Sequence, residues 1–341
     1  MNYNKLLQVF VLVLLLQSCV DTNKKLADFG AVSKKISGKV LSSGSVYMRY
    51  PFRVKQTDST LVIMDLHGSD FYYHEFSYPQ LKFKQSFAKP GIGPNEFLDA
   101  ENIRFDKQGK FYCLDANKSL ITIFDSDKND TTARIKLSDK LIRTLDFDIV
   151  NDSTFVVPDY TGKHRFNLIN RKGQITKSCF TIPSKRNKLS NVVLAQAWRS
   201  FIDYNPSNGV LAMVTQLGQV LEIYDLKKDS IINIVYGKAD EPEFINKGGY
   251  ASPCGIMGYS DVYVGKDKIY AIFWGKSFKD IENDPNSKDG GNLLQVFDLT
   301  GKPLRQYVLD KYITGFTVDE KHNKIIALDI NGNYPLVEYQ L

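Results

Sequence analysis

The sequence predicts an all-β protein, specifically a six-bladed β-propeller built from four-stranded antiparallel blades. The first observation behind this prediction is a strand-like repeat that occurs six times along the 341 residues. The second is the aromatic content of 12%, with 21 Phe and 19 Tyr, because these residues favour strands over helices. The third is that no long amphipathic pattern competes, since only Leu189–Ala197 suggests a single short helix.

The repeat begins with a strongly apolar six-residue segment that follows a polar turn in each unit. Its six copies are Thr60–Asp65, Lys110–Asp115, Thr154–Asp159, Gly209–Val214, Lys268–Phe273 and Lys324–Asp329. Their last residues lie about 53 positions apart on average, a period in the range of propeller and solenoid repeats. We therefore take one period as one structural unit.

A second apolar segment begins 25 residues after the start of the first in the fifth unit, and ten or eleven residues after it in each of the others. The second segments cover residues 71–76, 120–125, 165–170, 220–225, 293–298 and 335–340. Both types are short, rich in Val, Ile, Phe and Tyr, and bounded by turn residues, as strands are. Shorter strand-like segments before each pair, and one after each of the first five pairs, complete four strands per unit, as in a propeller blade.

The sixth unit ends at Leu341, directly after its third strand, which would leave an unpaired sheet edge. The segment Lys35–Leu41 lies outside the six units and is strand-like. We expect it to supply the missing outer strand, so that the two ends of the chain close the ring. Residues 35–341 then form one propeller without a domain boundary, because each repeat needs its neighbours to bury its faces.

Residues 1–18 have the pattern of an export signal. Lys5 precedes an apolar run from Leu6 to Leu16, which is too short to span a bilayer. The Leu16-Gln17-Ser18-Cys19 sequence resembles a bacterial lipobox, and this resemblance implies a lipid on Cys19, with residues 19–34 as a lipidated tether. Val20 follows the cysteine instead of aspartate, which favours the outer membrane. The alternative is an ordinary signal peptide with an incidental cysteine.

A second motif lies between the first two units, where Gly91, Gly93, Pro94, Glu96 and Phe97 form a G-x-G-P-x-E-F segment. This motif, in a chain of such repeats, resembles the TolB-like six-bladed propellers. The resemblance implies six blades and an exported, anchored protein, and it implies no particular reaction. The glycines and the proline indicate a shaped turn, in which Glu96 would accept backbone N–H groups and Phe97 would fill the space between blades. The alternative is that Glu96 is a ligand-binding or catalytic carboxylate.

The longest connections all belong to one face of the predicted ring. Links between blades and loops between second and third strands share a face, and the excess length lies at 88–101, 183–198, 237–259 and 275–291. Long loops on a rigid scaffold are frequent binding sites. Their aromatic and cationic side chains would suit a sugar, peptide or acidic ligand, unless they only pack the propeller mouth. The candidate binding residues are Arg186, Lys188, Trp198, Arg199, Tyr250 and Trp274.

Two hypotheses about function remain open. The first is a monomeric, non-enzymatic module that is anchored in the membrane through Cys19 and binds a glycan, peptide or protein through the long-loop face. The second is a hydrolase or lyase, with or without a divalent metal, that uses the carboxylates predicted on the strands lining the channel. These are Asp146, Asp148, Asp203 and Asp261.

The remaining sequence signals favour the first hypothesis. No nucleophile motif accompanies any of the four histidines, and no P-loop, dinucleotide-binding or zinc motif is present, so we predict no cofactor and no metal site. The net charge of +6 is spread along the chain and gives no case for nucleic-acid binding. Cys113 and Cys179 lie in apolar segments, where buried thiols are expected.

Overall fold

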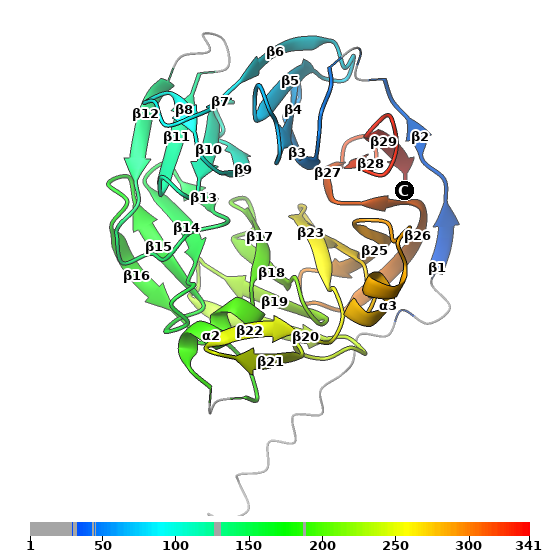
Figure 1. Ribbon diagram of the computed structural model, residues 1–341. Coiled ribbons are helices and arrows are strands. Elements are labelled where there is room, and N and C mark those ends of the chain that lie inside the picture. The colour runs from blue at the N-terminus through cyan, green and yellow to red at the C-terminus, as the bar shows by residue number, and fades with distance from the viewer. Residues whose placement is uncertain (1–28, 30–32, 43, 45, 126–130, 187–188) are drawn as a thin grey trace, which may run out of the picture.

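The computed structural model describes residues 29, 33–42, 44, 46–125, 131–186 and 189–341. Six antiparallel sheets stand in a ring around a central channel, which confirms the predicted fold class (Figure 1). The predicted export signal and Cys19 lie outside the described residues.

The first three blades follow the predicted order of four strands each. Blade 1 contains β3 (Pro51–Gln56), β4 (Thr60–Asp65), β5 (Tyr73–Ser77) and β6 (Phe83–Phe87). Blade 2 contains β9 (Ala100–Phe105), β10 (Phe111–Asp115), β11 (Leu120–Phe124) and β12 (Thr131–Lys136). Blade 3 contains β13 (Asp148–Asn151), β14 (Thr154–Pro158), β15 (Phe166–Asn170) and β16 (Ile175–Cys179).

The other three blades continue the ring. Blade 4 contains β17 (Ser200–Asn205), β18 (Val210–Thr215), β19 (Val220–Asp225) and β20 (Ser230–Tyr236). Blade 5 contains β23 (Tyr259–Val264), β24 (Lys268–Phe273), β25 (Gly291–Asp298) and β26 (Pro303–Ile313). Blade 6 contains β27 (Gly315–Asp319), β28 (Lys324–Leu328) and β29 (Leu336–Gln340) from the C-terminal part of the chain.

Apolar side chains on both faces of the second strands explain why the blades stack. Every residue of β4 is buried, and its alternate side chains point to opposite sides of the sheet. Leu61 and Ile63 pack against blade 6, whereas Val62 and Met64 pack against blade 2. The core is therefore a set of layers between neighbouring blades, and no blade buries its faces alone.

The N-terminal segment closes the ring as predicted, but it does so with two short strands. β2 (Lys39–Val40) pairs antiparallel with β29 and completes blade 6, while β1 (Ser33–Ile36) pairs parallel with β26 as a fifth strand of blade 5. Gly38 joins them, and a Cβ there would lie 2.3 Å from Val337, so only glycine allows this close crossing. Upstream, Phe29 is 8% exposed and meets the ring of Phe297 edge-on at 5.2 Å, so the end of the predicted tether packs against blade 5.

The long connections carry short elements of their own. They include β7 (Lys89–Pro90), β8 (Glu96–Phe97), the hairpin of β21 (Phe244–Lys247) and β22 (Tyr250–Pro253), and the helices α2 (Asn191–Ala197) and α3 (Phe278–Asn283). The expected short helix is α2, and it lies beside β22. Within the described part of the chain, neither helix has the length and apolarity that a membrane span requires.

Candidate functional site

The turn at the G-x-G-P-x-E-F motif is held by its own side chains and backbone. The N–H of Gly93 donates to Oε2 of Glu96 at 2.8 Å, and the N–H of Gly91 donates to the carbonyl of Phe97 at 2.9 Å. Lys118 Nζ donates to the carbonyl oxygens of Gly93 and Glu96. Phe97 is 2% exposed and packs between blades 1 and 2. These contacts stabilise the turn, and they occupy the Glu96 carboxylate within it.

Four aspartates that the sequence placed on channel-lining strands connect neighbouring blades. The side-chain Oδ2 of Asp146 accepts the N–H of Ile202 at 3.0 Å, so a carboxylate of blade 3 holds the first strand of blade 4. The same pattern recurs between blades 3 and 4, 4 and 5, and 5 and 6. The further pairs are Asp148 with the N–H of Tyr204, Asp203 with that of Val264, and Asp261 with that of Phe316.

Buried cations from blades 1 and 2 balance these carboxylates across the channel. Arg104 lies 3.1 Å from Asp146 and 3.0 Å from Asp148, and Lys55 lies 2.8 Å from Asp203. Burial nevertheless raises the pKa of Asp148 to about 6, with Arg104 acting in the opposite direction. Because every one of these carboxylates already binds backbone N–H groups and faces a cation, their geometry is that of a structural network.

Arg53 completes the channel network between two aromatic rings. Its guanidinium carbon lies 3.8 Å from the ring centroid of Phe52 and 4.1 Å from that of Phe201. Its Nε is 3.8 Å from Asp261. Across the described ranges, no three His, Cys, Asp or Glu side chains lie together as metal ligands would. The aspartates of the channel are therefore bonded within a structural network, which does not support their use as catalytic carboxylates.

Three further polar side chains, from blades 2, 3 and 4, lie at the end of the channel on the long-loop face. Glu101 is the second residue of β9 in blade 2, Tyr160 follows β14 in blade 3, and Arg199 precedes β17 in blade 4. We call these three residues the mouth cluster. The Tyr160 hydroxyl and the Arg199 Nε are buried, and neither has a hydrogen-bond partner in the described structure. Buried polar groups of native proteins are usually paired, so this arrangement is unusual.

The charge of Arg199 acts on both other groups of the mouth cluster. Burial raises the pKa of Glu101 to about 7, and the positive charge of nearby Arg199 opposes this shift. Burial also raises the pKa of Tyr160, with Arg199 again acting against the shift. Glu101 is 9% exposed, and no residue that the structure describes donates a hydrogen bond to its carboxylate. Strong perturbation without structural partners is typical of functional sites.

The five sequence-predicted binding residues that the structure describes have different surroundings. Arg199 belongs to the mouth cluster, whereas Trp198 beside it is fully buried and cannot reach a ligand at the surface. Arg186 stacks over the Phe244 ring at 5.0 Å and donates to its carbonyl oxygen, so it fastens the base of the hairpin. Tyr250 is 70% exposed at the hairpin tip, and Trp274 is partly buried with an unpaired indole N–H. Lys188 lies outside the described residues.

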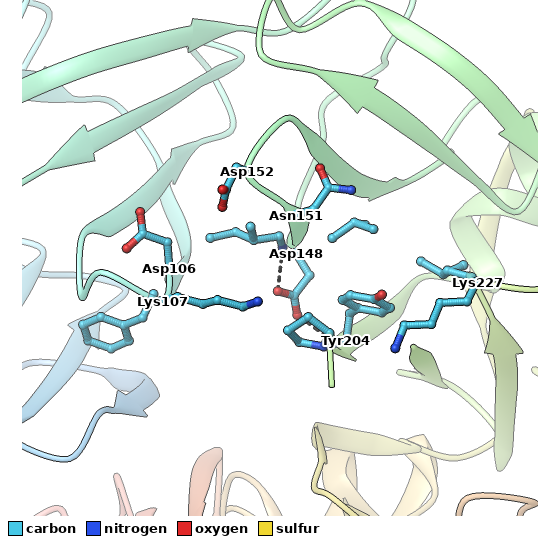
Figure 2. A pocket seen from close by; sticks show the side chains of 12 residues that line it. Asp106, Lys107, Asp148, Asn151, Asp152, Tyr204 and Lys227 are labelled. Atoms are coloured by element: carbon cyan, nitrogen blue, oxygen red, sulfur yellow. Dashed lines mark hydrogen bonds between the residues drawn. The ribbon is translucent and has the colours of Figure 1, made fainter. Parts of the chain in front are cut away.

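A cavity of about 640 Å³ opens on the opposite face, where no sequence pattern predicted a site. It lies among the first-to-second turns of blades 2, 3 and 4 and the third-to-fourth turn of blade 4 (Figure 2). Short turns form it, so loop length could not reveal it. We call it the basal cavity, and its polar lining consists of Asp106, Lys107, Asp148, Asn151, Asp152, Tyr204 and Lys227.

The ring of six four-stranded blades, completed by the N-terminal segment, defines a six-bladed β-propeller. The family model described as "TolB-like 6-blade propeller-like" matches residues 28–321, so the chain belongs to the TolB-like propeller family. None of the curated proteins compared with the sequence matches it.

Solved structures share the fold at low sequence identity. One is a protein named as exported from Bacteroides fragilis NCTC 9343, with 11% identity, a TM-score of 0.58, and coverage of 91% of this chain and 99% of that one. Another is a member of the DUF4221 family from Bacteroides vulgatus ATCC 8482, with 12% identity, a TM-score of 0.58, and coverage of 91% and 96%. At these identities the similarity concerns the fold alone.

Proposed function

We propose that this protein is an exported, lipid-anchored propeller that binds a glycan, peptide or protein partner through its long-loop face. The observation that carries this proposal is the mouth cluster, in which Tyr160 and Arg199 have buried polar atoms without hydrogen-bond partners and the Glu101 carboxylate has no donor in the described structure. A ligand that donates to Glu101 and accepts from Arg199 and Tyr160 would pair all three groups. Each buried group left unpaired costs about 1–3 kcal/mol, so pairing favours binding.

The rigidity of the surroundings supports the same proposal. Arg165, which flanks the cluster, donates to both carboxylate oxygens of Glu222 in blade 4 at 3.0 and 2.8 Å and to the Ser200 hydroxyl at 2.6 Å. Such a network fixes the strands on either side of Arg199. Preorganised groups lose little conformational entropy when they bind, which makes a few contacts sufficient for specificity.

A glycan and peptide array tests the binding proposal. We expect the purified protein to give a reproducible signal, Arg199→Gln to lower the affinity for that probe at least tenfold, and Lys247→Gln to leave it unchanged. Lys247 is the matched control, since it is exposed on the hairpin of the same face. Absence of any signal, or equal affinity of the Arg199→Gln protein, would contradict the proposal.

Export and anchoring form the second part of the proposal. The short apolar run before Cys19 and the exported status in the name of the B. fragilis relative support an envelope location, with the outer membrane as the expected site. Lipidation predicts that the mature chain begins at Cys19 and gains the mass of its acyl chains. Intact-mass measurement of the membrane fraction checks this, with Cys19→Ala expected to abolish both the added mass and the membrane association.

One observation favours a second candidate, a hydrolase or lyase centred on Glu101 instead of the channel aspartates. A carboxyl group with a pKa of about 7 is suited to general acid–base catalysis near neutral pH. Mass spectrometry of each bound probe after incubation distinguishes the two functions. Cleavage products that disappear in Glu101→Gln would assign an enzyme, whereas intact probes would assign a binding module.

A further inference from the structure

The basal cavity has the composition of a ligand site that is separate from the long-loop face. Blades 2, 3 and 4 all contribute to it, and its volume of about 640 Å³ lies within the range of small-molecule sites. Besides its seven polar residues, the lining has an apolar part formed by Phe105, Ile149, Val150, Pro206 and Leu226. We propose that this cavity binds a ligand that carries a carboxylate on an apolar body, such as a peptide end with an apolar last residue and a free C-terminus.

Two lysines provide the recognition of a carboxylate. Lys107 and Lys227 point into the cavity from opposite sides (Figure 2). The Lys107 ammonium has no hydrogen-bond or ion-pair partner in the described part of the chain, and Lys227 Nζ donates only to the carbonyl of Ser207, at 2.9 Å. Both ammonium groups therefore retain donors for a ligand. Hydrogen bonds between an ammonium and a carboxylate are about twice as strong as neutral ones.

Two of the three acidic side chains of the lining already have hydrogen-bond partners other than these lysines. Asp106 accepts the N–H groups of Gln108 and Lys110 and the hydroxyl of Tyr112. Asp148 accepts two backbone N–H groups and pairs with Arg104 of the channel network. Neither carboxylate is bonded to the side chain of Lys107 or Lys227, so both ammonium groups can still bind a ligand.

The third carboxylate complements a peptide. Asp152 lies on the rim of the cavity, and its side chain has no bonding partner among the residues described (Figure 2). It can accept an N–H of a peptide backbone whose terminal carboxylate lies between the lysines. An apolar last side chain would then contact the walls, where each buried CH₂ group contributes about 0.8 kcal/mol. A simple fatty acid would use the lysines and the walls but would leave Asp152 unused.

Calorimetric titration of the purified protein tests this site with three probes. They are an acetylated tripeptide that ends in leucine with a free carboxylate, the same tripeptide with an amidated C-terminus, and octanoate. We expect the free-acid peptide to bind, and the amidated peptide to bind at least tenfold more weakly. Tighter binding of octanoate than of the peptide would support the carboxylate site and would assign a free apolar acid as its ligand.

Substitutions of the two lining lysines test whether the peptide binds in the basal cavity. The double variant Lys107→Gln/Lys227→Gln should lower the affinity for the free-acid peptide at least tenfold, whereas Lys228→Gln should leave this affinity unchanged. Lys228 is the matched control because it is exposed in the same turn and pairs with Asp225 outside the cavity lining. Arg199→Gln should also leave this binding unchanged, so failure here is distinguishable from failure of the long-loop proposal. Equal binding of both peptides, no binding of any probe, or an unaffected double variant would overturn the inference.

Discussion

Carboxylates on or beside first strands are buried both in the interior of the channel and at its mouth. They differ in their hydrogen bonds within the described structure. In the interior, Asp146 accepts N–H groups from Ile202 and Phe147 and side-chain donors from Asn102 and Arg104. At the mouth, Glu101 is similarly buried, yet its carboxylate has no hydrogen bond within the described structure. Burial alone therefore does not identify a functional group, and the missing hydrogen-bond partner is the further feature that makes the Glu101 carboxylate a candidate.

The largest expected effect comes from removing an interior carboxylate. Asp146→Ala would leave Arg104 buried beside Asp148 alone and would free the N–H of Ile202. Removing one partner of a buried ion pair typically costs about 3–5 kcal/mol of unfolding free energy. Urea denaturation at pH 7 measures this loss. A loss below about 1 kcal/mol would mean that the interior carboxylates contribute no more to the unfolding free energy than the groups at the mouth.

A smaller loss is expected at the ion pair between blades 3 and 4 that borders the mouth. Glu222→Gln weakens the bonds that Arg165 and Tyr224 donate to it, and a bond to a charged group contributes about 1.5–3 kcal/mol. Glu338→Gln is the matched control, because its pair with Lys324 at 2.7 Å is partly exposed and such pairs contribute at most about 1 kcal/mol. Equal losses in the two variants by urea denaturation would contradict the distinction between buried and surface pairs.

The smallest effects distinguish two tyrosines. The Tyr78 hydroxyl donates to Asp319 at 2.6 Å, so Tyr78→Phe should cost about 1–2 kcal/mol. The Tyr160 hydroxyl is buried without a partner, so Tyr160→Phe should cause no loss and should raise the unfolding free energy by about 1–3 kcal/mol. Thermal denaturation of both variants under one condition compares them. A loss in Tyr160→Phe as large as that in Tyr78→Phe would show that the mouth hydroxyl is structurally engaged.

Much of the fold was accessible from the sequence because its physical cause is local. The six apolar segments that end near residues 65 to 329 became the second strands β4, β10, β14, β18, β24 and β28. The N-terminal closing strand was also predicted, since an open edge after Leu341 required a partner. Its division into β1 and β2 was not, because the crossing at Gly38 depends on side chains of blade 6 that are distant in sequence.

The candidate site was harder to predict from the sequence, because it depends on which strand ends lie together in the folded ring. Arg199 was among the candidates, but Glu101 in the segment AENIRF resembles any strand residue, and only its environment distinguishes it. Trp198 was expected on the surface, yet it packs with Val193 and Ala197 of α2 in a buried cluster. The basal cavity was not predicted because the sequence argument relied on long loops, whereas four short turns form this cavity.

The most direct test of the contrast between interior and mouth is the pH dependence of the difference in unfolding free energy between Glu101→Gln and the wild type. Burial raises the pKa of Glu101 to about 7 in the folded protein, against about 4.3 in an unfolded chain. Between these values the folded state holds the proton and the unfolded state does not, so wild-type stability falls as pH rises through this window. Glutamine does not titrate, and its stability lacks this loss.

Urea denaturation at pH 4.5 and pH 8 therefore gives a defined result. We expect the variant and the wild type to differ least at pH 4.5, and the variant to gain up to about 3 kcal/mol relative to the wild type by pH 8. A variant that becomes less stable than the wild type at pH 8 would show that the Glu101 carboxylate has a structural partner. That result would remove the mouth cluster as a candidate binding site.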